Sequence, residues 1–193
     1  AAACQEAIAA GIDVLGENRV QEMTEKLGQN AYDGAPLHFI GHLQTNKLKM
    51  VLPYVSLVQS VDSLHLLEAI DKWGEANAKV IEVLLEPHVT SEQTKQGFDP
   101  DELMNVLSTA DGYEHIRFRG IMGMATFTDD EAVVRSDFSR IKALADTIRE
   151  VYPGLVSDFT ELSIGMSDDY PIAVEYGSTM VRIGSMIFGE RNY

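Results

Sequence analysis

Two short stretches late in the sequence combine glycine with serine, residue types that often bind phosphate. They read SIGMSDD at 163–169 and GSMIFG at 184–189. Backbone N–H groups, serine hydroxyls and the positive end of a following helix can together bind an anion. The two stretches therefore suggest a phosphate site, and the candidate residues are Ser163, Ser167, Gly184 and Ser185.

Ser167 also has a simpler explanation. It precedes DDYPIAVEYG (168–177), where it can act as the N-cap of a helix with Pro171 in the first turn. Asp168 and Asp169 would complement the dipole of that helix, but they would oppose a bound anion unless they point away from it. The loop alone leaves capping and phosphate binding open.

Arg182 interrupts the otherwise apolar run MVRIGSMIFGE (180–190). Alternate side chains of a strand share a face, so Arg182 should face away from Val181 and Ile183. If those two residues face outer helices, Arg182 faces the interior, where a guanidinium needs partners. One interpretation is an ion pair with Glu161 or Glu17, and the other is contact with a ligand beside the glycine and serine loops.

Asn18 is a third candidate, in the stretch LGENRVQE (15–22). Alternation places it on the same face as Val14 and Gly16, at the end of a predicted strand. Its amide could donate to a ligand and accept from it. Glu17 and Glu22 are equally well explained as members of ordinary ion pairs.

The sequence gives no indication of a metal site or a nucleophilic triad. His38 and His42 are separated by four residues, which is roughly 13 Å along a strand and too far for one ion. The other histidines show no ligand-like spacing, and Cys4 is the only cysteine. We therefore assign no metal ligand and no catalytic residue.

The candidate residues lie in a regular alternation of apolar runs and helical patterns. Helical spacing is clearest at 63–78 and 131–152. The continuous apolar runs between such segments are typical of parallel strands covered by helices. This pattern predicts an α/β barrel of the TIM type rather than an open sheet, because no G-x-G-x-x-G turn follows an early strand. The predicted strands span 13–18, 37–43, 57–63, 79–87, 118–126, 159–167 and 179–189.

Seven strands are one fewer than a (β/α)8 barrel contains. Because CQEAIAAGI (4–12) resembles the end of a helix that leads into the first visible strand, we expect the barrel to lack its first strand in this chain. The loops at 163–169 and 184–189 then follow strands seven and eight, where such barrels often bind phosphate. Residues 1–193 are expected to form a single domain.

Composition limits the partners. The chain has 15 basic and 30 acidic residues, a net charge of -15, so its field should repel nucleic acid and anionic membranes. No apolar run approaches the ~20 residues of a membrane span, and the N-terminal residues do not resemble a signal peptide. We expect a cytoplasmic protein.

An ordered set of motifs resembles the pyridoxal phosphate homeostasis protein family. The motifs are GENRVQE, HFIGHLQTNK, SVDS, GIMGMATFTDD and ELSIGMSDDYPIAVEYGSTMVRIGSMIFGER, spread over about residues 11–193. The resemblance implies a barrel similar to the N-terminal domain of alanine racemase, with bound pyridoxal 5′-phosphate (PLP). It also implies that Asn18 lies beside the cofactor ring, that Arg182 faces the pyridine nitrogen, and that the phosphate lies near Ser163, Ser167, Gly184 and Ser185.

The chain departs from the family pattern at one point. The family attaches its cofactor through a Schiff base to a lysine at the end of the first strand, and no such stretch occurs here. None of the lysines ends a predicted strand, so we expect that lysine to belong to the missing strand. The lysines are Lys26, Lys47, Lys49, Lys72, Lys79, Lys95 and Lys142.

The resemblance leads to two hypotheses about function. The related racemases carry a second domain with a catalytic tyrosine, and this chain ends just past its last strand. The favoured hypothesis is a non-catalytic, monomeric PLP-binding protein that stores the cofactor or delivers it to recipient apo-enzymes in vitamin B6 homeostasis. The alternative is a PLP-dependent, racemase-like enzyme acting on amino acids.

Overall fold

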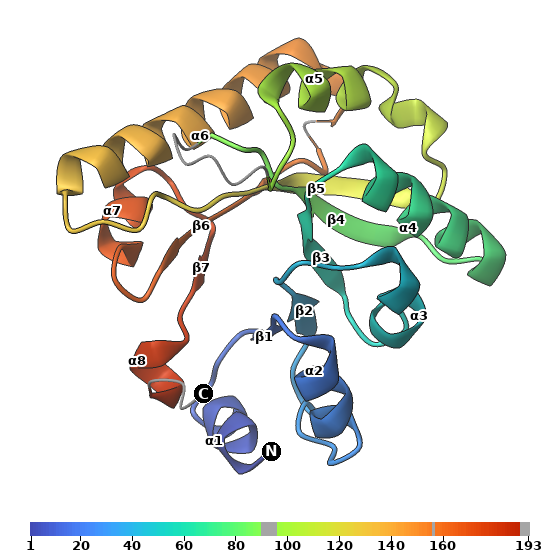
Figure 1. Cartoon of the computed structure of the whole chain (residues 1–193), viewed down its shortest axis with the longest axis vertical. Coiled ribbons are helices and arrows are strands. Elements are labelled where there is room, and N and C mark those ends of the chain that lie inside the picture. Colours follow the sequence, from blue (N-terminus) through green and yellow to red (C-terminus); the bar gives the residue numbers. More distant parts are fainter. Residues whose placement is uncertain (90–95, 156, 190–193) are drawn as a thin grey trace.

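The computed structural model describes residues 1–89, 96–155 and 157–189. Seven parallel strands form one sheet in sequence order (Figure 1). This confirms the predicted number of strands and their parallel arrangement, although several strands are shorter than predicted. The strands are β1 (Leu15–Glu17), β2 (Leu37–Phe39), β3 (Leu57–Val61), β4 (Ile81–Leu85), β5 (Ile116–Met122), β6 (Glu161–Met166) and β7 (Met180–Arg182).

Helices follow the strands and cover the outside of the sheet. The predicted helices 63–78 and 131–152 correspond to α4 and α6, which begin after the side-chain N-caps Ser63 and Asp130. The α-helices are α1 (Ala2–Ala9), α2 (Val20–Leu27), α3 (Leu48–Val51), α4 (Leu64–Asn77), α5 (Pro100–Ser108), α6 (Glu131–Val151), α7 (Tyr170–Glu175) and α8 (Ser185–Phe188). Short 3-10 helices are η1 (Thr45–Lys47), η2 (Ala110–Gly112) and η3 (Pro153–Leu155).

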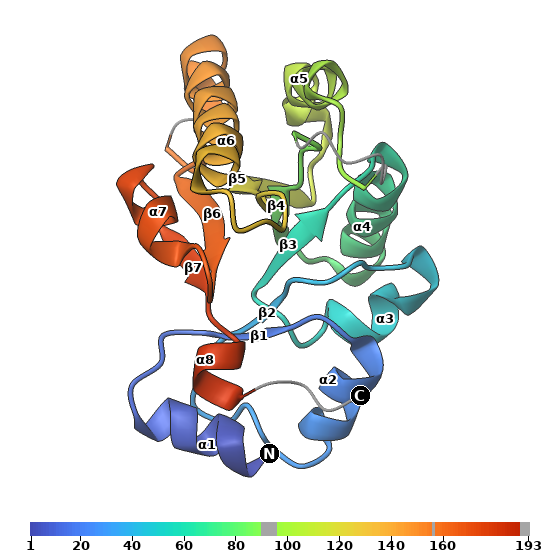
Figure 2. The ribbon, with the colours of Figure 1, turned by 60° about the vertical axis from the view of Figure 1, so that its left-hand side comes forward.

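The sheet curves into a nearly closed barrel. Each strand pairs with the next, but within the described residues β1 and β7 are not paired with each other. These two strands face each other across the open side, near α1 and α8 (Figures 1 and 2). The predicted barrel architecture is confirmed, with two unpaired strand edges where a closed barrel has none.

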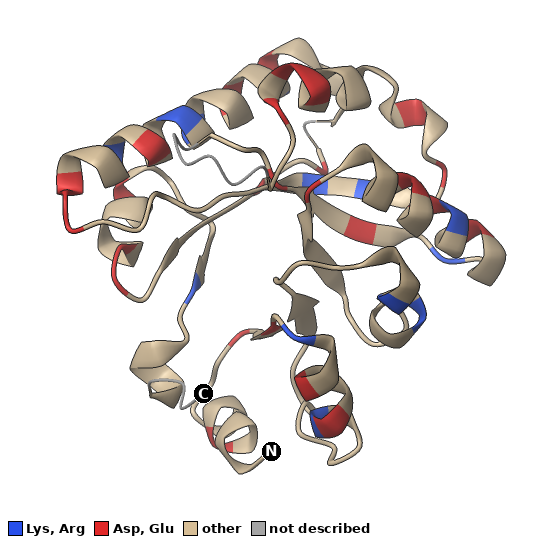
Figure 3. Cartoon of the chain, viewed as in Figure 1, with Lys and Arg blue, Asp and Glu red and all other residues tan. Residues whose placement is uncertain are grey.

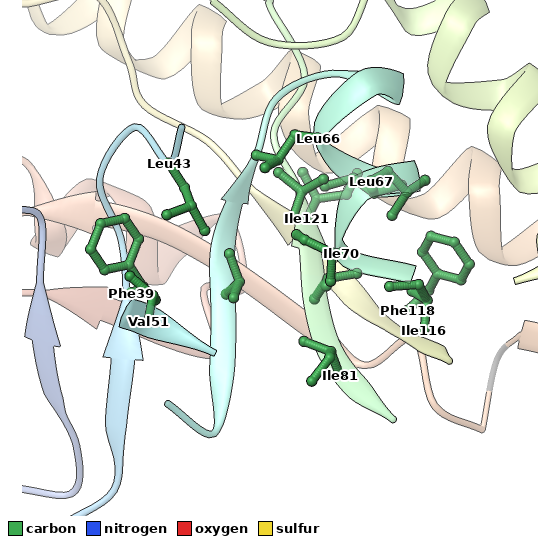
Figure 4. Packing of buried hydrophobic residues seen from close by; sticks show 14 of the residues in the cluster. Phe39, Leu43, Val51, Leu66, Leu67, Ile70, Ile81, Ile116, Phe118 and Ile121 are labelled. Atoms are coloured by element: carbon green, nitrogen blue, oxygen red, sulfur yellow. The ribbon is translucent and has the colours of Figure 1, made fainter. Parts of the chain in front are cut away.

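The main core lies between the outer surface of the sheet and the helices. Figure 4 shows part of it, where side chains of β2 to β5 meet those of α3 and α4. A smaller apolar layer fills the barrel interior and consists of Leu57, Leu84 and Met122, with Met180 packed against it. Outside the core, Asp and Glu lie along the outer helices (Figure 3), and none of the described helices is long and apolar enough to cross a membrane.

A polar layer also crosses the barrel interior. The Gln59 side chain bonds His38 Nδ1 at 2.9 Å and accepts a bond from Ser163 Oγ at 2.7 Å. Gln59 Nε2 also lies 2.9 Å from Met180 Sδ. Since His38, Gln59 and Ser163 are all buried, this network joins β2, β3 and β6 inside the barrel.

We expect His38 to make the fold sensitive to acid. Burial lowers the pKa of His38 from 6.5 to about 4, although Glu161 opposes the shift. The folded state therefore binds fewer protons than the unfolded state between those values, and the stability present above pH 6.5 is lost as pH falls. From pH 7 to pH 5 this amounts to about 2 kcal/mol. Urea unfolding at the two pH values should show no such loss of stability for His38→Gln. The control His65→Gln, on the exposed surface of α4, should lose stability as the wild type does.

The predicted strand at 179–189 is wrong in its second half. Only Met180–Arg182 pairs with β6, and after Gly184 the chain forms α8. Met186, Ile187 and Phe188 are exposed on that helix rather than buried in a strand. Apolar composition alone cannot separate a short exposed helix from the continuation of a buried strand.

Candidate functional site

The candidate residues gather where the strands end. In a parallel barrel all carboxyl ends lie at the same rim, which is where sites of this fold form. Asn18, Ser167 and Gly184, predicted from the sequence, follow β1, β6 and β7 at this rim. Further polar residues and one glycine follow the strands between them: His42, Asp62, Glu86 and Gly123.

Arg182 points into the barrel, as strand alternation predicts. Its Nη1 donates to the Ser163 carbonyl and to Ser163 Oγ, both at 2.8 Å. Its Nη2 donates to the Gly123 carbonyl at 2.9 Å. Burial lowers the pKa of Arg182 to about 10, while Glu86 and Asp169 act in the opposite direction. The guanidinium thus remains a cation and holds the end of β7 to those of β5 and β6.

The proposed ion pairs of Arg182 with Glu161 or Glu17 do not form. Glu17 accepts from Lys26 Nζ at 2.5 Å and from Tyr32 Oη at 2.9 Å. Glu161 accepts from Thr179 Oγ1 at 2.8 Å. Both glutamates bond other neighbours, and the hydrogen bonds of Arg182 go to neutral oxygens.

The two glycine and serine loops meet at the rim. The backbone N–H of Gly184 donates to Ser167 Oγ at 3.3 Å, so the loop after β6 contacts the start of α8. Gly165 allows the first loop to approach α7, because its φ is +96° and an added Cβ would lie 2.6 Å from Ala173 Cβ. Ser185 is the first residue of α8 and is exposed.

Ser167 does not cap the following helix. α7 begins at Tyr170, and its N-cap residue is Asp169. The Asp169 carboxylate instead accepts the backbone N–H of Met166 at 2.6 Å, which closes a turn over 167–169. The capping interpretation is wrong because this turn separates Ser167 from the helix, and it leaves the hydroxyl facing Gly184.

The two serines of the first loop have different surroundings. Ser163 is fully buried, and its hydroxyl donates to Gln59 and accepts from Arg182. Ser167 is only half-buried. A ligand at the rim can therefore reach Ser167, whereas Ser163 contacts Arg182.

Asn18 lies at the other end of the sheet, in a small cavity. The neighbouring loop approaches closely, because a Cβ on Gly41 would lie 2.1 Å from the Asn18 carbonyl oxygen. His42, in the same cavity, bonds Asp62 through Nδ1 at 3.0 Å. Asn18 thus lies beside the loop after β2, while Arg182 points into the barrel from β7. The cavity is lined by Asn18, Arg19, Val20, Gln21, His42, Gln44 and Lys47.

No lysine in the described part of the chain directly follows the end of a strand. Lys47 is the lysine of the Asn18 cavity, and it belongs to η1. Lys26 bonds Glu17, and Lys79 precedes β4. Lys95 falls outside the described residues. For the lysines within the described residues, these positions agree with the expectation that none ends a strand.

Glu86 is a rim residue that the sequence reasoning missed. Its side chain follows β4 on the same face as Leu84, which belongs to the interior layer. Burial and the charge of Asp62 raise the pKa of the Glu86 carboxyl to about 7, while Arg182 and His42 lower it. The alternation of Glu82, Leu84 and Glu86 could have revealed a carboxyl at the barrel mouth.

The histidines and acidic residues of the rim do not form a metal site. Within residues 1–89, 96–155 and 157–189, no group of three His, Cys, Asp or Glu side chains could hold a metal ion. The site instead offers the half-buried guanidinium of Arg182, the carboxyl of Glu86 and two loops that meet through Ser167 and Gly184.

Comparison of the sequence with known proteins identifies relatives over nearly its whole length. The family model described as "Alanine racemase, N-terminal domain" matches residues 1–192. A pyridoxal phosphate homeostasis protein of Haemophilus influenzae is 35% identical over 186 residues, which are 95% of this chain and 78% of that protein. The protein of the same name from Aquifex aeolicus is 36% identical over 183 residues, covering 95% and 79%.

Solved structures give the same relationship. PipY of Synechococcus elongatus with PLP bound has a TM-score of 0.88 and 31% identity, over 97% of this chain and 87% of that one. An alanine racemase from Clostridium difficile shares the fold, with a TM-score of 0.74 and 17% identity over 98% of this chain and 48% of that one.

Proposed function

Because this chain belongs to the alanine racemase N-terminal domain family, and within it to the pyridoxal phosphate homeostasis proteins, we propose that it binds PLP without catalysing a reaction. Its role is to store or deliver the cofactor in vitamin B6 homeostasis. The observation that carries the proposal is the inward-facing Arg182 beside the contact between Ser167 and Gly184.

The residues of the rim fit this cofactor. A guanidinium has five N–H donors, and the three hydrogen bonds of Arg182 to Ser163 and Gly123 leave two for a ligand. Arg182 is therefore the donor to the pyridine nitrogen, and Ser163 positions it. Ser167, Gly184 and Ser185 bind the phosphate, and Asn18 contacts the ring from the β1 side.

The chemistry of Arg182 fits a carrier. When bound, PLP supplies an aldehyde that reacts with amines and a ring that can withdraw electrons. Many PLP enzymes strengthen that withdrawal with a carboxylate, which keeps the pyridine nitrogen protonated. Arginine donates a hydrogen bond there without giving up its proton, so the chain holds the cofactor in a less reactive state.

A PLP-dependent, racemase-like enzyme is the second candidate. Glu86 favours it, because a buried carboxyl with a pKa near 7 at the barrel mouth could act as a general acid or base. Exchange of the α-hydrogen of amino acids in deuterated water, with the PLP-loaded chain, distinguishes the two. A carrier leaves the amino acids unlabelled, whereas turnover that Glu86→Gln abolishes supports the enzyme.

Ser167→Ala tests the phosphate part of the site. We expect its affinity for PLP to fall about tenfold, since a hydrogen bond to a charged group contributes about 1.5 kcal/mol or more. Its affinity for pyridoxal, which lacks the phosphate, should not change. Equilibrium dialysis measures both, with Ser108→Ala on the exposed end of α5 as the control. Equal loss for both ligands would show that Ser167 does not bind the phosphate.

The proposed role also implies partners and a location. We propose that this chain acts in the cytoplasm as a monomer. Its partners in this role are recipient apo-enzymes. The loaded chain should therefore reactivate a PLP-dependent apo-enzyme. Reactivation no faster than with the same concentration of free PLP would argue for storage rather than delivery.

A further inference from the structure

Glu86 is a carboxyl in the barrel mouth without a hydrogen-bonded partner. The residue is only 9% exposed, and no hydrogen bond or ion pair engages its side chain among the described residues. Its backbone is fixed on both sides, since its N–H donates to Val61 and its carbonyl accepts from Phe98, both at 2.8 Å. Among the described residues no fully buried side-chain oxygen lacks a hydrogen-bond partner, so the carboxyl oxygens of Glu86 reach solvent at the barrel mouth. The rest of the side chain is buried, which disfavours the charged form, and the carboxyl can exchange a proton with solvent.

Charged groups from three other strand ends act on the Glu86 carboxyl through their electrostatic fields. Asp62 follows β3, and its negative charge disfavours the carboxylate form of Glu86. Arg182 on β7 and His42 after β2 favour the carboxylate form. His42 is itself bonded to Asp62, whereas the hydrogen bonds of Arg182 go to neutral oxygens of Ser163 and Gly123.

We propose that Glu86 is the proton acceptor of the PLP site and takes up a proton when the cofactor binds. This inference rests on the proposed function and goes beyond it, because it couples occupancy of the site to pH. PLP brings a phosphate with about two negative charges into the mouth and engages the Arg182 guanidinium. Both effects disfavour the Glu86 carboxylate.

The sign of the coupling follows from linkage. Ligand binding that favours the protonated form of Glu86 takes protons from solution and weakens as pH rises. At pH 7.5 a carboxyl that titrates near 7 is mostly ionised in the free protein. If the ligand moves its pKa up by one unit, uptake is about half a proton for each ligand bound.

Calorimetry measures this uptake. Titration of pyridoxine 5′-phosphate, which has the phosphate and ring but no aldehyde, at pH 7.5 in buffers of different ionisation enthalpy gives the number of protons exchanged. We expect the wild-type chain to take up about half a proton more than Glu86→Gln. Glu82→Gln is the matched control, because Glu82 shares the strand and face of Glu86 but bonds Arg117 at the opposite end. It should exchange protons as the wild type does.

The outcomes separate this inference from the proposed function. Binding with equal proton uptake in wild type and Glu86→Gln overturns the inference and leaves the proposed function standing. Absence of binding in all three proteins overturns both. NMR of the protein without ligand tests Glu86 independently of binding. The 13C carboxyl resonance of Glu86 should titrate near pH 7. Ionisation complete below pH 5 would contradict the proton-acceptor role.

Discussion

Replacing Arg182 with leucine is expected to lower the affinity for PLP by about 100-fold, because the variant loses a charge-assisted hydrogen bond worth about 1.5 to 3 kcal/mol and the positive charge of the guanidinium. The chain should still fold, but with lower stability. The oxygens of Ser163 and Gly123 that Arg182 bonds at 2.8 to 2.9 Å lose their donor. We expect a loss of about 2 to 3 kcal/mol in the free energy of unfolding. Equilibrium dialysis with PLP and urea unfolding measure the two effects.

Arg119→Leu is the matched control for Arg182→Leu. Arg119 lies on β5 and pairs with Glu82 and Asp158, away from the rim. Its replacement should leave PLP affinity unchanged. If Arg182→Leu loses stability but keeps wild-type affinity for PLP, then Arg182 is purely structural and does not contact the cofactor.

Glu86→Gln is expected to stabilise the chain at high pH. The pKa of Glu86 is raised from 4.5 to about 7 in the folded protein, mainly by burial. The folded state therefore holds more protons than the unfolded state between these values, and the wild type loses stability as pH rises through this window. Glutamine has no proton to lose. The free energy of unfolding of Glu86→Gln, relative to that of the wild type, should therefore increase by about 2 to 3 kcal/mol between pH 5 and pH 8.

Urea unfolding of both proteins at pH 5 and pH 8 measures this difference. Glu82→Gln serves as the control, since the Glu82 side chain is more than one-third exposed and pairs with Arg117 and Arg119. Its difference from the wild type should stay nearly constant between the two pH values. A constant difference for Glu86→Gln as well would mean that Glu86 remains ionised in the folded chain.

The sequence predicted those features that depend on local periodicity. The seven apolar runs correspond to seven parallel strands, and alternation along 180–184 correctly turned Arg182 inward. Alternation works here because the side chains of a strand must point to opposite faces.

Features that depend on contacts between distant segments could not be predicted. The partners of Arg182 come from β5 and β6, and the obvious candidates Glu17 and Glu161 bond other neighbours. The turn that removes Ser167 from the helix N-terminus depends on the Asp169 side chain folding back to Met166. The raised pKa of Glu86 could not be predicted, because it depends on burial and on charged residues from three other strand ends.

The most direct test of PLP binding at the barrel mouth is a crystal structure of the chain grown with PLP. We expect the phosphate to lie between Ser167 and the Gly184–Ser185 backbone, and the pyridine nitrogen to accept from Arg182. Cofactor bound without contact to Arg182 and Ser167 would contradict this placement, as would an unoccupied mouth at millimolar PLP.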